Sequence, residues 1–182
     1  IKVGDKSLII NTKIESFKSV NNIAKVIEVP LSYKTLIEKG DLIMIHHNVF
    51  RRWHNMRGEE KNSKSYFKNG LYFVQRDQIY LYKKKDKWQA FDDRCFVAPL
   101  EDNVDINNWQ EQKLVGILKY GNSVLDALGI NKGDLVGYKL FGEYDFVVDG
   151  KRLYCMKSND IVIKYEHQGN EIEYNPGWAQ SS

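Results

Sequence analysis

The stretch from Gly129 to Glu166, GINKGDLVGYKLFGEYDFVVDGKRLYCMKSNDIVIKYE, decides the fold of this chain. Runs rich in Val, Ile, Tyr and Phe that are bounded by Gly, Asp or Asn are typical of strands and their turns. Asp149-Gly150 predicts a tight hairpin, because Asp and Gly tolerate the positive φ that such a turn needs. The stretch contains four such apolar runs, at residues 135–141, 144–148, 153–156 and 161–165. It therefore predicts a small, closed all-β unit.

Part of this pattern occurs twice in the chain. Ile37, Lys39, Gly40, Asp41 and Leu42 are repeated 93 positions later as Ile130, Lys132, Gly133, Asp134 and Leu135. The strand-like run that precedes each Lys-Gly-Asp segment also recurs, and residues 70–74 resemble residues 150–156. Gly supplies an unrestricted turn and Asp bonds to nearby backbone before the strand begins. Gly-Asp turns before strands are common, so chance is the alternative, but the ordered agreement of several elements favours a duplicated unit.

The second half of the chain also resembles the GroES co-chaperonins. The resemblance runs from about residue 97 to residue 166 and keeps the order of the family's motifs. It is carried by Pro99, Leu100, Asp102, Val104, Gly121, Lys132, Gly133, Asp134, Val136, Gly142, Tyr144, Val148, Asp149, Gly150, Asp160 and Ile161. The resemblance implies β-barrel subunits that form a ring on an ATP-driven chaperonin and hold no cofactor of their own.

We therefore expect an all-β chain of two tandem GroES-like small β-barrels. The first comprises residues 1–98 and carries an insertion at residues 46–69, and the second comprises residues 99–166. The short link near residue 98 predicts that the two units pack together. Residues 122–128 are the best candidate for a helix, and residues 167–182 are expected to form an extended C-terminal arm that lies on a neighbour.

Composition excludes several classes of protein. The chain has 182 residues, is 42% hydrophobic and 28% charged, and carries a net charge of +3, as ordinary globular proteins do. No apolar run approaches the roughly 20 residues that cross a bilayer. Cys95 and Cys155 have no nearby cysteine partner, which favours two buried, reduced thiols over a disulfide. The expected location is the cytoplasm of a host cell or a virion.

The chaperonin-binding loop of the GroES family is not evident here. The resemblance places it at residues 105–113 in the second unit and at Glu15 to Asn22 in the first, and both segments are short and lack an aliphatic triplet. The insertion is the candidate replacement, because Trp, Phe and Arg dominate binding hot spots. Its predicted partner-binding residues are Val49, Phe50, Arg51, Arg52, Trp53 and Met56.

Two other kinds of site are less favoured. His46, His47 and His54, with Cys95, are residue types that bind zinc. Adjacent histidines on a strand point to opposite faces, however, so only one of His46 and His47 would reach a shared site. The Arg-rich and Lys-rich insertion also suits nucleic acid. Glu59, Glu60, Asp77 and Asp86 dilute its charge, so a protein contact is the better interpretation.

No catalytic motif is present, so we expect a protein that is not an enzyme. Two functions of different class remain, with protein partners and self-assembly in both. The first is a GroES-like co-chaperonin of a bacteriophage that helps virion proteins to fold or assemble. The second is a structural or decoration protein of a virion that reuses the barrel as an assembly module. A nucleic-acid-binding β-barrel is third.

Overall fold

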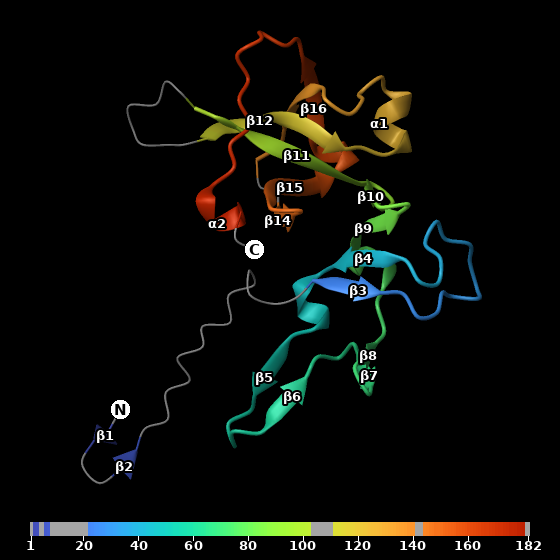
Figure 1. Cartoon of the computed structure of the whole chain (residues 1–182), viewed down its shortest axis with the longest axis vertical. Helices are drawn as coiled ribbons and strands as arrows, with labels where there is room; N and C mark the ends of the chain where they lie inside the picture. The colour runs from blue at the N-terminus through green and yellow to red at the C-terminus, as the bar shows by residue number, and fades with distance from the viewer. Residues whose placement is uncertain (1, 4–5, 8–21, 103–110, 141–143, 181–182) are drawn as a thin grey trace. The chain divides into compact units, whose positions relative to one another are not determined.

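The computed structural model describes residues 2–3, 6–7, 22–102, 111–140 and 144–180 (Figure 1). Most of the expected chaperonin-binding segments (15–21 of 15–22, and 105–110 of 105–113) and the motif residues Val104 and Gly142 lie outside these residues. The contacts of the chain divide it into two compact units. Unit 1 comprises Ile1–Ile23 and Ile45–Gln78, and unit 2 comprises Ala24–Met44 and Ile79–Ser182. The expected boundary between residues 98 and 99 lies within a single strand of unit 2.

The described chain is mostly β-structure, as the sequence predicts. A four-stranded sheet has the order β10-β9-β4-β3, formed by β3 (Ile23–Lys25), β4 (Leu42–Ile45), β9 (Ile79–Lys84) and β10 (Lys87–Ala90). The strands β9 and β10 are joined through Lys85 and Asp86, which both have positive φ (48° and 60°). This hairpin and the turn role of Asp86 were expected from the charged run at residues 83–87.

A six-stranded antiparallel sheet lies in unit 2, with the order β14-β15-β11-β12-β13-β16. Its strands are β11 (Arg94–Glu101), β12 (Glu111–Tyr120), β13 (Leu135–Tyr138), β14 (Tyr144–Val148), β15 (Lys151–Lys157) and β16 (Ile161–Tyr165). The hairpin at Asp149-Gly150 forms as predicted, with φ values of 49° and 74°. Among the described residues, β14 and β16 remain at the two edges, and the pairings do not close this sheet into a barrel.

The core of unit 2 lies on both faces of β11. Successive side chains of a strand point to opposite faces, so Cys95 and Val97 enter one apolar cluster while Phe96 and Ala98 enter the other. The cluster around Phe96 also contains Met44, Leu81 and Trp88, and therefore joins the two sheets. Cys95 and Cys155 are free, buried thiols, which confirms the prediction. Burial raises the pKa of the Cys95 thiol to about 12.

The two Lys-Gly-Asp segments have the same backbone geometry, which gives the repeat a structural basis. Gly40 and Gly133 have φ values of 96° and 98°. The N–H of Gly40 donates to the carbonyl of Val26 at 2.8 Å, and the N–H of Gly133 donates to that of Leu118 at 2.8 Å. In return, Val26 and Leu118 each donate to the following Asp carbonyl, Asp41 or Asp134, at 2.9 Å. Both turns therefore set the start of their next strand, β4 or β13, in the same way.

Helical structure is limited to short segments in the described chain. Residues 122–128 contain α1 (Ser123–Ala127), as predicted, and Asn122 caps it by accepting from the N–H groups of Val124 and Leu125. A second helix, α2 (Gly177–Gln180), and three single 3₁₀ turns complete the list: η2 (His47–Val49), η3 (Arg76–Gln78) and η4 (Ser158–Asp160). None of the helices in the described residues has the length and apolar character needed to cross a membrane.

The C-terminal segment packs on its own unit rather than extending away as an arm. Glu173 forms a β-bridge with Leu100, where the pairing of β11 with β15 has already ended. Glu101 donates its N–H to Ile172, and Tyr174 donates to Pro99, each at 2.8 Å. Ala179 in α2 is fully buried. The expected arm on a neighbour is therefore replaced by a strap that extends the sheet of unit 2 and covers part of its core.

The insertion expected at residues 46–69 folds into hairpins within unit 1. β5 (Arg52–His54) pairs antiparallel with β6 (Glu60–Asn62), and β7 (Tyr66–Lys68) pairs with β8 (Leu71–Tyr72). A further small pair joins β1 (Lys2–Val3) to β2 (Lys6–Ser7). Isolated two-stranded hairpins bury little surface and are marginal alone. The side chains that these hairpins leave exposed are therefore candidates for contact with another molecule.

Candidate protein-contact surface on the hairpins of unit 1

The turn of the β5–β6 hairpin is built around Asn55. Its side-chain oxygen accepts from the N–H groups of Arg57 (2.9 Å) and Glu59 (3.0 Å), and its amide nitrogen donates to the Glu59 carboxylate at 2.8 Å. An Asn side chain that bonds to backbone a few residues on is a common way to fix a turn. These bonds fix the loop between the strands and leave Met56 at its tip.

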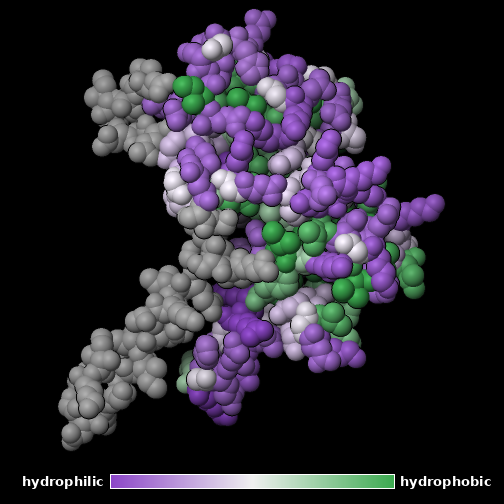
Figure 2. Space-filling view, in the orientation of Figure 1, coloured by the Kyte–Doolittle hydropathy of each residue, from purple (hydrophilic) through white to green (hydrophobic). Residues whose placement is uncertain are grey.

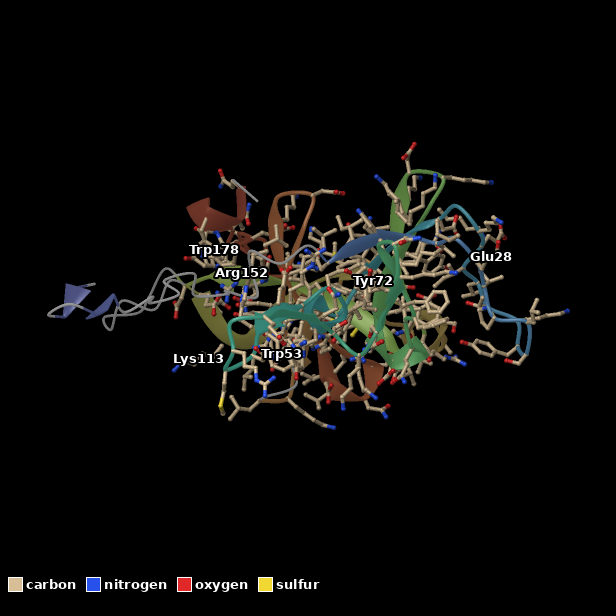
Figure 3. All side chains as sticks on the ribbon, turned by 90° about the horizontal axis from the view of Figure 1, so that it is seen from below. Glu28, Trp53, Tyr72, Lys113, Arg152 and Trp178 are labelled. Carbon is tan, nitrogen blue, oxygen red and sulfur yellow. The ribbon has the colours of Figure 1, made fainter. Side chains whose placement is uncertain are left out.

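Trp53 and Met56 are the two large apolar side chains that this hairpin exposes. Trp53 is 48% exposed and lies opposite Lys61 in the strand register, and Met56 is fully exposed. Figure 3 labels Trp53 on the ribbon of β5. Arg51 and Arg52 are exposed as well. Single exposed apolar residues are normal, but a Trp and a Met on one exposed hairpin are residue types enriched at protein interfaces.

The other two predicted partner-binding residues have different positions. Val49 is fully buried, so its side chain is not available to a partner. Phe50 is half-buried and packs edge-on against Tyr72, with ring centroids 4.9 Å apart. The sequence pattern did not distinguish these two from their neighbours, because the 3₁₀ turn η2 ends at Val49 and interrupts the strand-like alternation there.

Charge on the hairpin is only partly balanced. Glu60 lies 3.7 Å from Arg52, and Glu59 lies 3.0 Å from Lys61. Hydrogen bonds from Lys61 and then Asn55 lower the pKa of the Glu59 carboxyl. Residues 51–61 carry four Arg and Lys against these two carboxylates, so the surface around Trp53 stays basic.

The histidines of the insertion do not form a metal site in the described part of the chain. His46 caps the 3₁₀ turn by accepting from the N–H of Asn48 at 3.1 Å, and its ring stacks on that of His47 at 4.4 Å. Burial and then the neighbouring charges of His46 and Arg51 lower the pKa of His47. The expectation of a strand with histidines on opposite faces was wrong about the local structure, since η2 begins at His47.

A second exposed surface on unit 1 was missed by the sequence analysis. The β7–β8 hairpin turns Tyr66 and Tyr72 inward, with ring centroids 5.4 Å apart, and exposes Phe67 and Phe73. The sequence has two pairs of adjacent aromatic residues, at 66–67 and 72–73, and adjacent residues of a strand point to opposite faces. The sequence does not show which of the two faces is covered, so the exposed pair was visible only in the structure.

A cluster of charges around Arg152 lies in unit 2, where Figure 3 shows Arg152 beside Trp178. Arg152 donates to Asp145 at 2.9 Å, to Glu111 at 2.5 Å and to the Tyr154 hydroxyl at 2.8 Å. Tyr154 donates in turn to Glu111 at 2.7 Å. Burial, and then this bond to Glu111, raise the pKa of Tyr154. These mutual hydrogen bonds link β12, β14 and β15, so the cluster has a structural role.

Comparison with protein-family models, with curated proteins and with solved structures finds no match for this chain. The class of this protein is therefore described from its fold and its exposed hairpins alone. It is an all-β protein with a repeated turn, and among the described residues of unit 1 the most exposed large apolar side chains lie on the β5–β6 and β7–β8 hairpins.

Proposed function

We propose that this chain is a tandem GroES-like protein of the co-chaperonin type, without catalytic activity, which binds a protein partner through the β5–β6 hairpin. The repeated geometry at Gly40 and Gly133 supports two copies of one small β-unit. The motif order that resembles GroES supports the family.

The exposed pair Trp53 and Met56 is the observation that carries the proposal. The β5–β6 hairpin follows the strand after the first Lys-Gly-Asp turn, and the second half of the chain has no counterpart of it. A hairpin that serves only the fold gains little from exposing a Trp ring, whereas a docking site gains a large rigid contact area. The hairpin is therefore the candidate replacement for the binding loop that the resemblance leads one to expect.

Co-sedimentation of the full chain with a purified bacterial chaperonin ring, without nucleotide and with ATP or ADP, tests this function. Nucleotide-dependent binding is expected, and Trp53→Ala with Met56→Ala should weaken it by at least tenfold, as loss of a hot spot does. Leu128→Ala, at a side chain that is 69% exposed in unit 2, is the control and should bind normally. Absence of binding in every nucleotide state would refute the co-chaperonin function.

A structural role in a virion is the second candidate, and the open edges of the six-stranded sheet favour it. Val162, Ile163 and Tyr165 on the edge strand β16 are 58%, 46% and 42% exposed. An edge strand with apolar side chains on both faces is a template for pairing with another chain. Self-association that is abolished by Val162→Lys in sedimentation velocity, without chaperonin binding, would support this assembly role.

A further inference from the structure

The outer face of the β7–β8 hairpin presents two aromatic rings to solvent. Phe67 and Phe73 are 51% and 67% exposed, and their ring centroids lie 5.0 Å apart with the planes inclined by 53°. The N–H of Phe73 donates to the carbonyl of Ser65 at 2.7 Å, which continues the hairpin beyond β8 and holds the second ring beside the first. Two large rings on one exposed face form a ready platform for planar groups.

The two rings contact each other across the hairpin, but they take no part in its inner face. That face is formed by Tyr66 and Tyr72, which lie edge-on to each other, and Phe50 packs edge-on against Tyr72. Because Phe67 and Phe73 are both more than half exposed, they are accessible to another molecule. This outer pair is also separate in sequence from the Trp53 and Met56 side chains of β5–β6.

The segment that carries the outer pair is positively charged. Residues 62–75 contain Lys64 and Lys68 and no Asp or Glu, whereas Lys61 belongs to β6 and pairs with Glu59. The Lys68 ammonium lies 5.0 Å from the centroid of the Phe67 ring. Over residues 45–78 there are seven Arg and Lys against three Asp and Glu, a net charge of +4, whereas the whole chain carries only +3. The basic excess of the protein is therefore concentrated in this segment.

The structure removes the sequence-level objection to a nucleic-acid site. That objection was the dilution of the basic charge by Glu59, Glu60, Asp77 and Asp86. Glu59 and Glu60 lie on the other hairpin, where they pair with Lys61 and Arg52. Asp77 lies in η3, beyond the end of β8, and Asp86 lies in the turn between β9 and β10 of unit 2. Lys68 thus lies by the Phe67 ring, and the exposed Lys64 precedes β7 in the same segment, which contains no carboxylate.

We propose that the outer face of β7–β8 binds single-stranded nucleic acid without sequence preference. Bases stack on Phe67 and Phe73, while Lys64 and Lys68 neutralise phosphates of the same strand. Exposed aromatic rings beside uncontested lysines suit a ligand that carries flat rings and negative charge together. Duplexes fit poorly because their bases are already stacked on one another. This activity goes beyond the proposed co-chaperonin function and does not depend on it.

Fluorescence anisotropy of a labelled oligothymidine of about 20 nucleotides, titrated with the full chain at about 50 mM salt, tests the site. Binding is expected, and Phe67→Ala with Phe73→Ala should weaken it by about tenfold or more, because stacking contributes strongly for each base. Lys64→Gln with Lys68→Gln should weaken it and lower the slope of log affinity against log salt by about 1.4, since each phosphate contact on a single strand contributes about 0.7.

Two controls separate stacking from folding. Phe67→Leu with Phe73→Leu keeps apolar bulk and removes the rings, so it should lose binding while its melting temperature stays close to that of the natural sequence. Tyr144→Ala removes a 60% exposed ring in unit 2 and should leave binding unchanged. Failure of the natural protein to bind at low salt would overturn the proposal. So would unchanged oligothymidine affinity in both Phe variants, and if these variants lost chaperonin binding instead, the face would be a protein contact.

Discussion

The connections that lead into β4 and β13 share one turn and differ in almost everything before it. The first connection, residues 26–41, and the second connection, residues 121–134, end in Lys-Gly-Asp turns with matched hydrogen bonds. In both, the Asp side chain also accepts from the N–H three residues earlier, at 2.8 Å for Asp41 and 2.7 Å for Asp134. The two turns are therefore built alike, although the segments before them differ.

What fills the two connections is different. The second contains α1, whose Leu125 is fully buried in the core of unit 2. The first contains no helix, and its Leu31, Tyr33 and Leu36 are 104%, 47% and 64% exposed. Figure 2 shows apolar, green side chains over this part of the molecule. A short turn motif therefore sets where the next strand begins, while coverage of the core depends on the residues between the preceding strand and the turn.

The largest expected change in stability distinguishes the two connections. Leu125→Ala should lower the free energy of unfolding by about 2–5 kcal/mol, because it leaves a cavity in a packed core. Leu31→Ala should change it by less than about 0.5 kcal/mol, because its side chain is exposed. Urea denaturation followed by tryptophan fluorescence measures both. A large loss for Leu31→Ala would show that the first connection is also buried, and the contrast would fail.

An intermediate loss of stability is expected from the same substitution at either turn. Gly133→Val and Gly40→Val each force a β-branched residue to a φ near 97°, although an added Cβ would meet no atom within 4 Å. The cost is therefore conformational strain, of order 1–3 kcal/mol at either site. Thermal unfolding should show similar losses for the two variants. If one variant melts like the natural protein, the two turns are not equivalent.

The smallest expected change in stability depends on pH and distinguishes the two turns by the carboxylates that nearby lysines contact. Lys164 of β16 lies 2.6 Å from the Asp134 carboxylate, whereas at the first turn Lys84 of β9 pairs with Glu38 rather than with Asp41. The hydrogen bond from Lys164, and then the N–H of Asn131, lower the pKa of Asp134. Its stabilisation is therefore present above the ordinary pKa of Asp and is lost as pH falls through the lowered value.

Asp134→Asn should accordingly cost about 0.5–1 kcal/mol at pH 7, in the range of exposed ion pairs, and Asp41→Asn less. Melting curves recorded between pH 7 and acid conditions check this expectation. The difference between Asp134→Asn and the natural protein should shrink as pH falls. A difference that stayed constant over that range would show that the charge of Asp134 is not the cause.

Much of the local structure could be predicted from residues alone. The hairpins at Lys85-Asp86 and Asp149-Gly150, the helix at 122–128 and the start of β13 all follow from turn and cap chemistry that acts within a few residues. The exposure of the candidate contact residues was predicted less well. Trp53 and Met56 are exposed as expected, but Val49 is buried and the pair Phe67 and Phe73 was missed. Which face of a short strand is covered depends on distant parts of the chain.

The sequence by itself determined where this chain turns, because positive φ at Gly40, Gly133 and Gly150 is a requirement of the local backbone. It also determined that β-structure dominates, through the alternation of Val, Ile, Tyr and Phe. The tertiary structure was needed to show that the C-terminal strap pairs with β11, and that Phe67 and Phe73 share an exposed face on a different hairpin from Glu59 and Glu60. Those outcomes depend on contacts between residues far apart in sequence, whose free energy no local pattern reveals.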